Sequence, residues 1–138
     1  MSEPVYMLDT NMVSHMIRFP DGIVMARADR HEKSALCVSV MTASELRYGV
    51  NKRGSSQLAL LVEGALSLLS ILPFEEKSTQ SYADIRHMLA ERGQMIGPVD
   101  LFIAAHARSL GLTMVTANVR EFSRVPGLRI ENWLEGVS

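Results

Sequence analysis

The sequence predicts an α/β fold, with a central parallel sheet of four to five strands covered by helices on both faces. Two observations carry this prediction. Short apolar runs that resemble buried strands recur along the chain, and stretches with apolar residues at helical spacing separate them. Strands that are apolar throughout, rather than alternating, are typical of parallel sheets buried on both faces.

The elements follow in order from these runs and from helix-ending residues. The predicted strands are 5–8, 35–40, 70–72 and 113–116, with a fifth candidate at 128–130, and the predicted helices are 11–19, 22–30, 42–51, 55–67, 78–92 and 98–110. Pro20 ends the first helix and Pro98 opens the last long one, while Gly93 and Gly111 stand where helix-ending glycines are expected. No repeat or linker-like tract interrupts the pattern, so we expect residues 1–138 to form a single domain.

Composition narrows the functional classes. The chain is 47% hydrophobic and 21% charged, as is usual for a globular protein. Its one cysteine, Cys37, excludes an internal disulfide, and its apolar surroundings predict a packing role. No secretion signal or membrane-spanning run is visible, so we expect a cytoplasmic protein with no membrane partner.

The first predicted strand runs directly into Asp9, Thr10 and Asn11. All three residue types are good helix N-caps, so one of them could cap the helix that follows. Alternatively, they could form one corner of a site, because ligands of parallel sheets gather at the carboxyl ends of the strands. Asp9 alone does not decide between these two interpretations.

Three further acids also have ordinary structural explanations. Glu45 completes a capping-box pattern that starts at Thr42. Asp100 falls in the first turn of a largely apolar helix, where the helix dipole favours a negative charge. Glu121 stands three residues after Asn118, as in an ordinary capped turn of helix.

Together, the four acids predict a metal site, because each lies just beyond a strand end or at a helix start facing that edge. Clustered carboxylates repel one another unless cations hold them, and oxygen ligands alone favour Mg²⁺ or Mn²⁺. Such ions are widely used to hydrolyse phosphodiesters. The net charge of −1 argues against a nucleic-acid partner, but setting the four acids aside leaves 11 of the 15 acidic residues against 14 Lys and Arg. The remaining surface is therefore net basic and suits RNA.

Three segments resemble, in order, the signature blocks of PIN-domain ribonucleases, and most of all the VapC-type toxins of type II toxin–antitoxin pairs: MLDTNMV, VSVMTASELRYGV and IGPVDLFIAAHARSLGLTMVTANVREFSRVPGLRIENW. The resemblance extends from residue 6 to residue 133. It implies a PIN-like three-layer α/β/α sandwich, commonly dimeric, that acts as an endoribonuclease with Mg²⁺ or Mn²⁺.

The resemblance also implies roles for the acids. By position, Asp9 and Asp100 correspond to the core metal ligands of the family. Glu45 corresponds to a third catalytic acid that helps to hold a metal or its water. Glu121 corresponds to a fourth, more peripheral acid.

Three polar residues correspond to groups that support the acids. Thr116 and Asn118 resemble the pair that orients them, and Asn11 is expected to hydrogen-bond across the pocket. Asn118 stands where some relatives carry an acid, which leaves open whether one or two ions bind.

The function that the resemblance implies is cleavage of a structured RNA by a metal-activated water, leaving 5′-phosphate and 3′-hydroxyl ends. The best guess for the substrate is a tRNA, such as the anticodon loop of an initiator tRNA.

A cognate antitoxin is expected to occlude the acidic pocket, with walls at 46–50 and 12–17, and the toxin is expected to form a homodimer. The alternative is a catalytically weak PIN-like scaffold or RNA-binding module. A P-loop nucleotide-binding domain is disfavoured, since no GxxxxGK[ST] motif is present.

Overall fold

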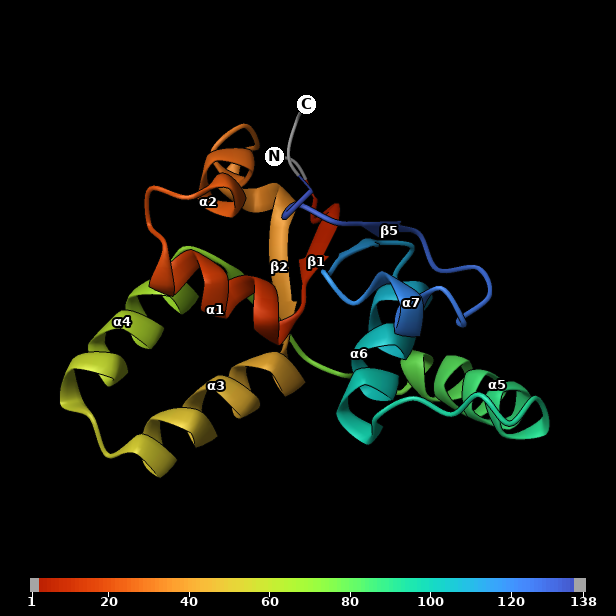
Figure 1. The fold of residues 1–138 in the computed structure, drawn as a ribbon. Helices are drawn as coiled ribbons and strands as arrows, with labels where there is room; N and C mark the ends of the chain where they lie inside the picture. The colour runs from red at the N-terminus through yellow and green to blue at the C-terminus, as the bar shows by residue number, and fades with distance from the viewer. Residues whose placement is uncertain (1–2, 136–138) are drawn as a thin grey trace.

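The structure is a computed structural model that describes residues 3–135 (Figure 1). The elements follow in the order β1 (Tyr6–Leu8), α1 (Thr10–Arg18), α2 (Ile23–Ala28), the 3₁₀ helix η1 (Lys33–Ala35), β2 (Leu36–Ser39), α3 (Val40–Arg53), α4 (Ser56–Ser67), β3 (Ser70–Leu72), α5 (Lys77–Glu91), α6 (Pro98–Ser109), β4 (Thr113–Val115), α7 (Val119–Phe122) and β5 (Ile130–Glu131). Every predicted strand and long helix is present. The fifth strand begins at Ile130, later than predicted.

The five strands form one sheet in the order β3-β2-β1-β4-β5, and every neighbouring pair is parallel. Met7 of β1 is in register with Cys37 of β2 on one side and with Met114 of β4 on the other. All the strands therefore end at one edge, and α1, α3 and α6 begin near that edge (Figure 1). The predicted α/β fold with a central parallel sheet is confirmed.

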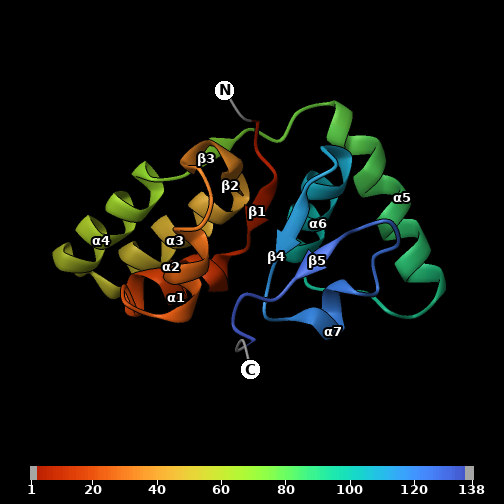
Figure 2. The same cartoon turned by 90° about the horizontal axis from the view of Figure 1, so that it is seen from above.

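Consecutive strand residues face opposite sides of the sheet and so contribute to two separate cores. Leu8 packs with the buried side chains of α1, α2, α3 and α4. Met7, its neighbour, packs with those of α5, α6 and α7. Figure 2 shows these two groups of helices on opposite sides of the sheet. Burial on both faces explains why the strands are apolar throughout.

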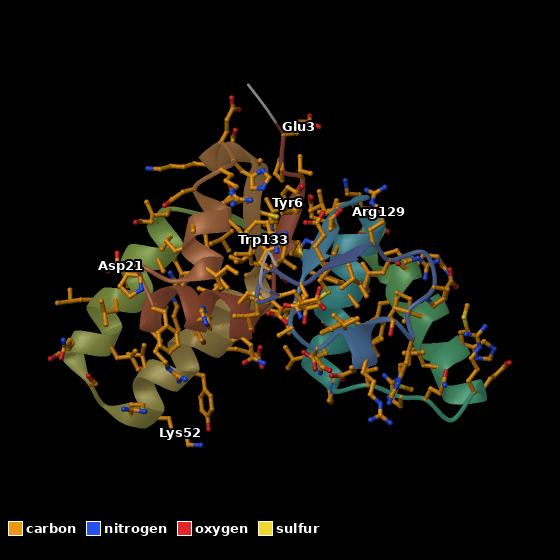
Figure 3. The ribbon with its side chains drawn as sticks, turned by 45° about the horizontal axis from the view of Figure 1, so that its top comes forward. Glu3, Tyr6, Asp21, Lys52, Arg129 and Trp133 are labelled. Carbon is orange, nitrogen blue, oxygen red and sulfur yellow. The ribbon has the colours of Figure 1, made fainter. Side chains whose placement is uncertain are left out.

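The C-terminal segment closes the first of these cores. Trp133 is buried, and its ring meets that of Tyr6 edge-on at 5.4 Å between centroids (Figure 3). The ring of His31 stacks on Trp133 at 5.5 Å and also contacts Tyr6, at 4.7 Å between centroids. This aromatic contact ties the end of the described chain to the start of β1.

Two buried residues, Cys37 and His106, bear on which side chains a site could use. Cys37 is fully buried and burial raises the pKa of its thiol to about 12, so it packs as predicted and is not a nucleophile at neutral pH. His106 is also fully buried, with Nδ1 2.9 Å from the hydroxyl of Ser39, so it belongs to the core. In the described part of the chain, no helix is long and apolar enough to cross a membrane.

Candidate functional site

The four predicted acids come from four different elements that meet at the carboxyl edge of the sheet. Asp9 directly follows β1, Glu45 lies on α3, Asp100 lies in the first turn of α6, and Glu121 lies on α7. The charges of Asp9, Glu45 and Glu121 all raise the pKa of Asp100, which places the four carboxylates in one neighbourhood. The structure therefore brings together residues that are up to 112 positions apart in the sequence.

Asp9 is both a helix cap and a member of this cluster. Its Oδ1 accepts a hydrogen bond of 2.9 Å from the amide of Met12, so Asp9 and not Thr10 or Asn11 caps α1. The side chain is only 5% exposed. Burial raises the pKa of Asp9 most strongly, while hydrogen bonds from the Thr116 hydroxyl and the Met12 amide lower it. The two alternatives for this residue are thus compatible.

Glu45 is not part of a capping box. Helix α3 begins at Val40, two residues earlier than predicted, because the Ser39 hydroxyl caps it by accepting a hydrogen bond of 3.1 Å from the Met41 amide. Glu45 consequently lies in the second turn, beyond reach of the helix N-terminus. Its Oε1 instead accepts a hydrogen bond from the hydroxyl of Thr10, at the start of α1.

Asp100 and Glu121 form the other half of the cluster. The Oε1 of Glu121 accepts a hydrogen bond of 2.9 Å from the backbone amide of Gly97, and its Oε2 accepts one from the side chain of Asn118. Burial raises the pKa of Asp100 to about 7, and the charge of Glu121 and a hydrogen bond with it act in the same direction. Asp100 therefore gives up its proton only near neutral pH in the absence of a cation.

The supporting polar residues divide into two groups. Thr116 is fully buried, and its Oγ1 accepts a hydrogen bond of 3.0 Å from the Asn118 amide while its hydroxyl bonds to Asp9. Asn118 precedes α7 without capping it through its side chain, and it holds Glu121 instead. Asn11 is exposed and makes no side-chain hydrogen bond within residues 3–135, so its role stays a prediction.

Two contributors to the site were not predicted from the sequence. The sequence places Thr10 at a helix cap or at one corner of a site, but it does not predict the hydrogen bond that the Thr10 hydroxyl donates to Glu45, 35 positions away. Gly97 was not singled out, although it stands just before Pro98 in the segment that carries Asp100. Long-range side-chain pairing of this kind leaves no local pattern in the sequence.

The chemistry of these donors fits a hard divalent cation. All four acids offer oxygen alone, which suits Mg²⁺ or Mn²⁺ better than zinc. Across the described residues, no three His, Cys, Asp or Glu side chains are already arranged to hold an ion. Mg²⁺, however, commonly binds to one or two carboxylates and keeps several waters. Asp9 and Asp100 fit such a two-carboxylate site, and a cation there would counter the burial and the carboxylate repulsion that raise both pKa values.

A groove of about 510 Å³ leads away from the acids between α1, α3 and α4. Thr10 and Glu45 line one part of it, and Leu46, Leu58 and Leu61 are among its apolar walls. Arg18 and Arg53 also line the groove, and neither forms an ion pair with another described residue. Of the predicted walls, 46–50 contributes Leu46 and Gly49 to the groove, and 12–17 contributes Ser14 and Ile17. Met12 does not line it, because it is buried in the core.

Comparison with known sequences finds matches to PIN-domain and VapC proteins over most of the chain. The family model described as "PIN domain" matches residues 6–128. A protein named Ribonuclease VapC2 from Haemophilus influenzae is 40% identical over 130 residues, covering 94% of this chain and 98% of its own length. A protein named tRNA(fMet)-specific endonuclease VapC from Salmonella typhimurium is 40% identical over 129 residues, covering 93% and 97%.

Comparison with solved structures also finds VapC-type proteins, in VapBC complexes. The VapBC structure from Salmonella typhimurium bound to DNA contains a chain with a TM-score of 0.87 and 38% identity, covering 94% of this chain and 98% of that one. VapBC2 from Rickettsia felis, bound to a promoter DNA fragment, gives a TM-score of 0.86 and 34% identity with the same coverage. The chain belongs to the PIN-domain family, and within it to the VapC-type ribonucleases.

Proposed function

We propose that this protein is a divalent-metal-dependent endoribonuclease and the toxin of a toxin–antitoxin pair. The observation that carries the proposal is the set of four carboxylates at the carboxyl edge of the sheet: the charges of Glu45 and Glu121 raise the pKa of both Asp9 and Asp100. Such a cluster costs stability in a protein that does not use it.

In the proposed mechanism, the carboxylates of Asp9 and Asp100 would hold Mg²⁺ or Mn²⁺, which when bound would supply Lewis-acid and water-activating chemistry. Glu45 is oriented by Thr10, and Glu121 by Gly97 and Asn118. These two acids keep acceptor lone pairs free to orient a water for in-line attack on the RNA phosphate. The RNA 2′-hydroxyl is not needed as a nucleophile, so the products carry 5′-phosphate and 3′-hydroxyl ends.

We further propose that the substrate is a tRNA, with the initiator tRNA as first choice. The support is that two relatives, from Salmonella typhimurium and Shigella flexneri, are named tRNA(fMet)-specific endonucleases and are 40% and 39% identical to this chain. Sequencing of RNA ends after brief induction tests this, with Asp9→Asn as the control. New 5′-phosphate ends in the tRNA anticodon loop, absent from the control, are expected, while ends that appear equally with Asp9→Asn would refute the assignment.

The proposed partner is an antitoxin that occupies the groove between α1, α3 and α4. The solved relatives from Rickettsia felis and Salmonella typhimurium are VapBC complexes. An apolar antitoxin segment fits the leucines of the groove, and a basic side chain at its end would reach the acids. We also expect the toxin to be a cytoplasmic homodimer, which sedimentation and cell fractionation would check.

The groove assignment has a matched pair of variants on α4. Leu61 lines the groove and is 47% exposed, whereas Leu60 does not line it and is 76% exposed. Leu61→Glu is expected to weaken antitoxin binding at least about tenfold, the loss of one well-packed contact. Leu60→Glu should leave binding unchanged, and both variants should cleave RNA normally. Equal binding by the two variants in calorimetry would place the antitoxin elsewhere.

The second candidate function is an RNA-binding scaffold with weak or no catalysis. The observation that favours it is that no three potential ligands in residues 3–135 are already arranged around an ion position. Calorimetric titration with Mn²⁺ separates the two functions. Binding at micromolar to millimolar Mn²⁺ supports the nuclease, and no heat of binding at millimolar Mn²⁺ supports the scaffold.

A further inference from the structure

Gly97 lies where the two acids of α6 and α7 meet. It is the residue before Pro98, at the N-cap position of α6. Its amide donates the 2.9 Å hydrogen bond to Glu121 Oε1, and Asp100 lies three residues further along the helix. Gly97 therefore contacts one acid through its backbone and neighbours the other through the first turn of the helix.

The backbone of Gly97 does not require glycine. Its φ of −58° and ψ of 147° are open to any L residue, and they suit a residue that precedes proline. The N-cap position itself favours Ser, Thr, Asp or Asn, whose side chains would accept a hydrogen bond from a free helix amide. No side chain caps α6. Neither conformation nor capping thus accounts for glycine at this position.

The space beside Gly97 gives a different explanation. A Cβ atom at this residue would lie 3.3 Å from Asp100 Oδ2 and 3.8 Å from Glu121 Oε1. The first distance is shorter than an ordinary van der Waals contact, so the carboxylate of Asp100 would have to move by a few tenths of an ångström. A side chain at residue 97 would therefore displace the carboxylate of Asp100 while touching that of Glu121 at an ordinary contact distance.

We propose that Gly97 is a positioning residue: its missing side chain lets the carboxylates of Asp100 and Glu121 approach, and so sets the affinity of the site for a divalent cation. This inference rests on the metal-dependent function proposed above. It assigns to Gly97 a role in cation affinity and turnover that is separate from the stability of α6. In a side chain placed at residue 97, a capping oxygen should change the stability of α6, whereas the Cβ should change the affinity of the site for the cation.

The test compares Gly97→Ser with Gly97→Ala in the full chain. Serine supplies a capping oxygen and alanine does not, so Gly97→Ser should unfold at the wild-type temperature or above it, and Gly97→Ala below Gly97→Ser. Both variants carry the intruding Cβ, so both should bind Mn²⁺ at least about tenfold more weakly in calorimetry, in the range seen for groups that support metal ligands. The kcat for RNA cleavage should fall with the loss of the cation.

The control is Gly64→Ser on α4, where a Cβ would have no atom within 4 Å. This variant should match the wild type in Mn²⁺ affinity and kcat. If Gly97→Ser and Gly97→Ala bound Mn²⁺ as the wild type does, the inference would be overturned while the proposed nuclease stood. If Mn²⁺ affinity followed unfolding temperature across the two variants, the role of Gly97 would be structural only. If the wild type itself bound no Mn²⁺, the metal-dependent function would fail, and this inference with it.

Discussion

The two halves of the acidic cluster are built in opposite ways. Asp9 receives hydrogen bonds from a backbone amide and a buried hydroxyl, and both favour its charged form. For Asp100, by contrast, every interaction that shifts its pKa raises it, and the largest contribution after burial comes from Glu121. The protein thus offsets part of the burial cost of Asp9 with its own hydrogen bonds, and gives Asp100 no interaction that favours the charged form.

This difference suggests how the site divides its tasks. The half formed by Asp9 is part of the fold, because the same carboxylate caps α1. The half formed by Asp100 costs stability when no cation is present, as is common where function rather than folding selects a residue. Substitutions in the two halves should therefore have similar effects on activity and different effects on stability.

The largest expected effect comes from removing either ligand. Asp9→Ala and Asp100→Ala should each lower RNA cleavage by more than about 100-fold, beyond the range typical of groups that only support a ligand. Asp9→Ala should also lose roughly 1 kcal/mol of unfolding free energy with its helix cap, whereas Asp100→Ala should lose none. Urea denaturation without metal measures the unfolding free energy of each variant. An equal loss in both variants would contradict the proposed difference between the two halves of the cluster. Asp9→Asn, which keeps a capping oxygen, is the control for the helix cap.

A smaller effect is expected from the donors that orient the outer acids. Thr10→Val removes the hydroxyl that holds Glu45, and should lower kcat by about tenfold with little change in unfolding temperature. Thr10→Ser keeps the hydroxyl and should restore most of the rate. If Thr10→Val cleaved RNA as fast as Thr10→Ser, the hydrogen bond from residue 10 to Glu45 would have no role in the rate.

The smallest expected effect is on the pH dependence of stability in the metal-free protein. Folding raises the pKa of Asp100 from its usual 3.8 to about 7, so the folded state binds more protons than the unfolded state in this interval. Stability should therefore fall as pH rises from 3.8 to about 7, and stay low above it. Asp9 shifts in the same direction.

Asp100→Asn should remove much of this dependence. With allowance for solvent screening, it should unfold roughly 2–5 °C above the wild type at pH 8 in scanning calorimetry with a chelator present. Saturating Mn²⁺ should reverse the order, because only the wild type gains from the cation. A wild type that gained stability between pH 4 and 7 would contradict the raised pKa of Asp100.

The fold was accessible from the sequence because its signal is local. Apolar strands followed by helices are a pattern of neighbours, and both faces of the sheet are buried as that pattern requires. The position of Asp9 and Glu121 at one edge followed from strand direction, and that of Asp100 from the helix start that faces this edge.

What the sequence could not supply were interactions decided by small shifts or long separations. Placing the start of α3 at Thr42 instead of Val40 made Glu45 look like a capping residue, since a capping box requires one fixed position in the first turn. The bond from Thr10 to Glu45 and the open space at Gly97 depend on how separate elements pack. Local patterns do not record that packing.

The most direct test of the central claim is cleavage of purified initiator tRNA with the divalent cation under control. The account predicts that EDTA stops cleavage by the wild type, that added Mn²⁺ restores it, and that Asp100→Asn remains inactive at the same Mn²⁺ concentration. The cut ends should carry 5′-phosphate. Cleavage that continued in EDTA at the wild-type rate, or an Asp100→Asn variant as fast as the wild type, would contradict a metal site built from Asp9 and Asp100.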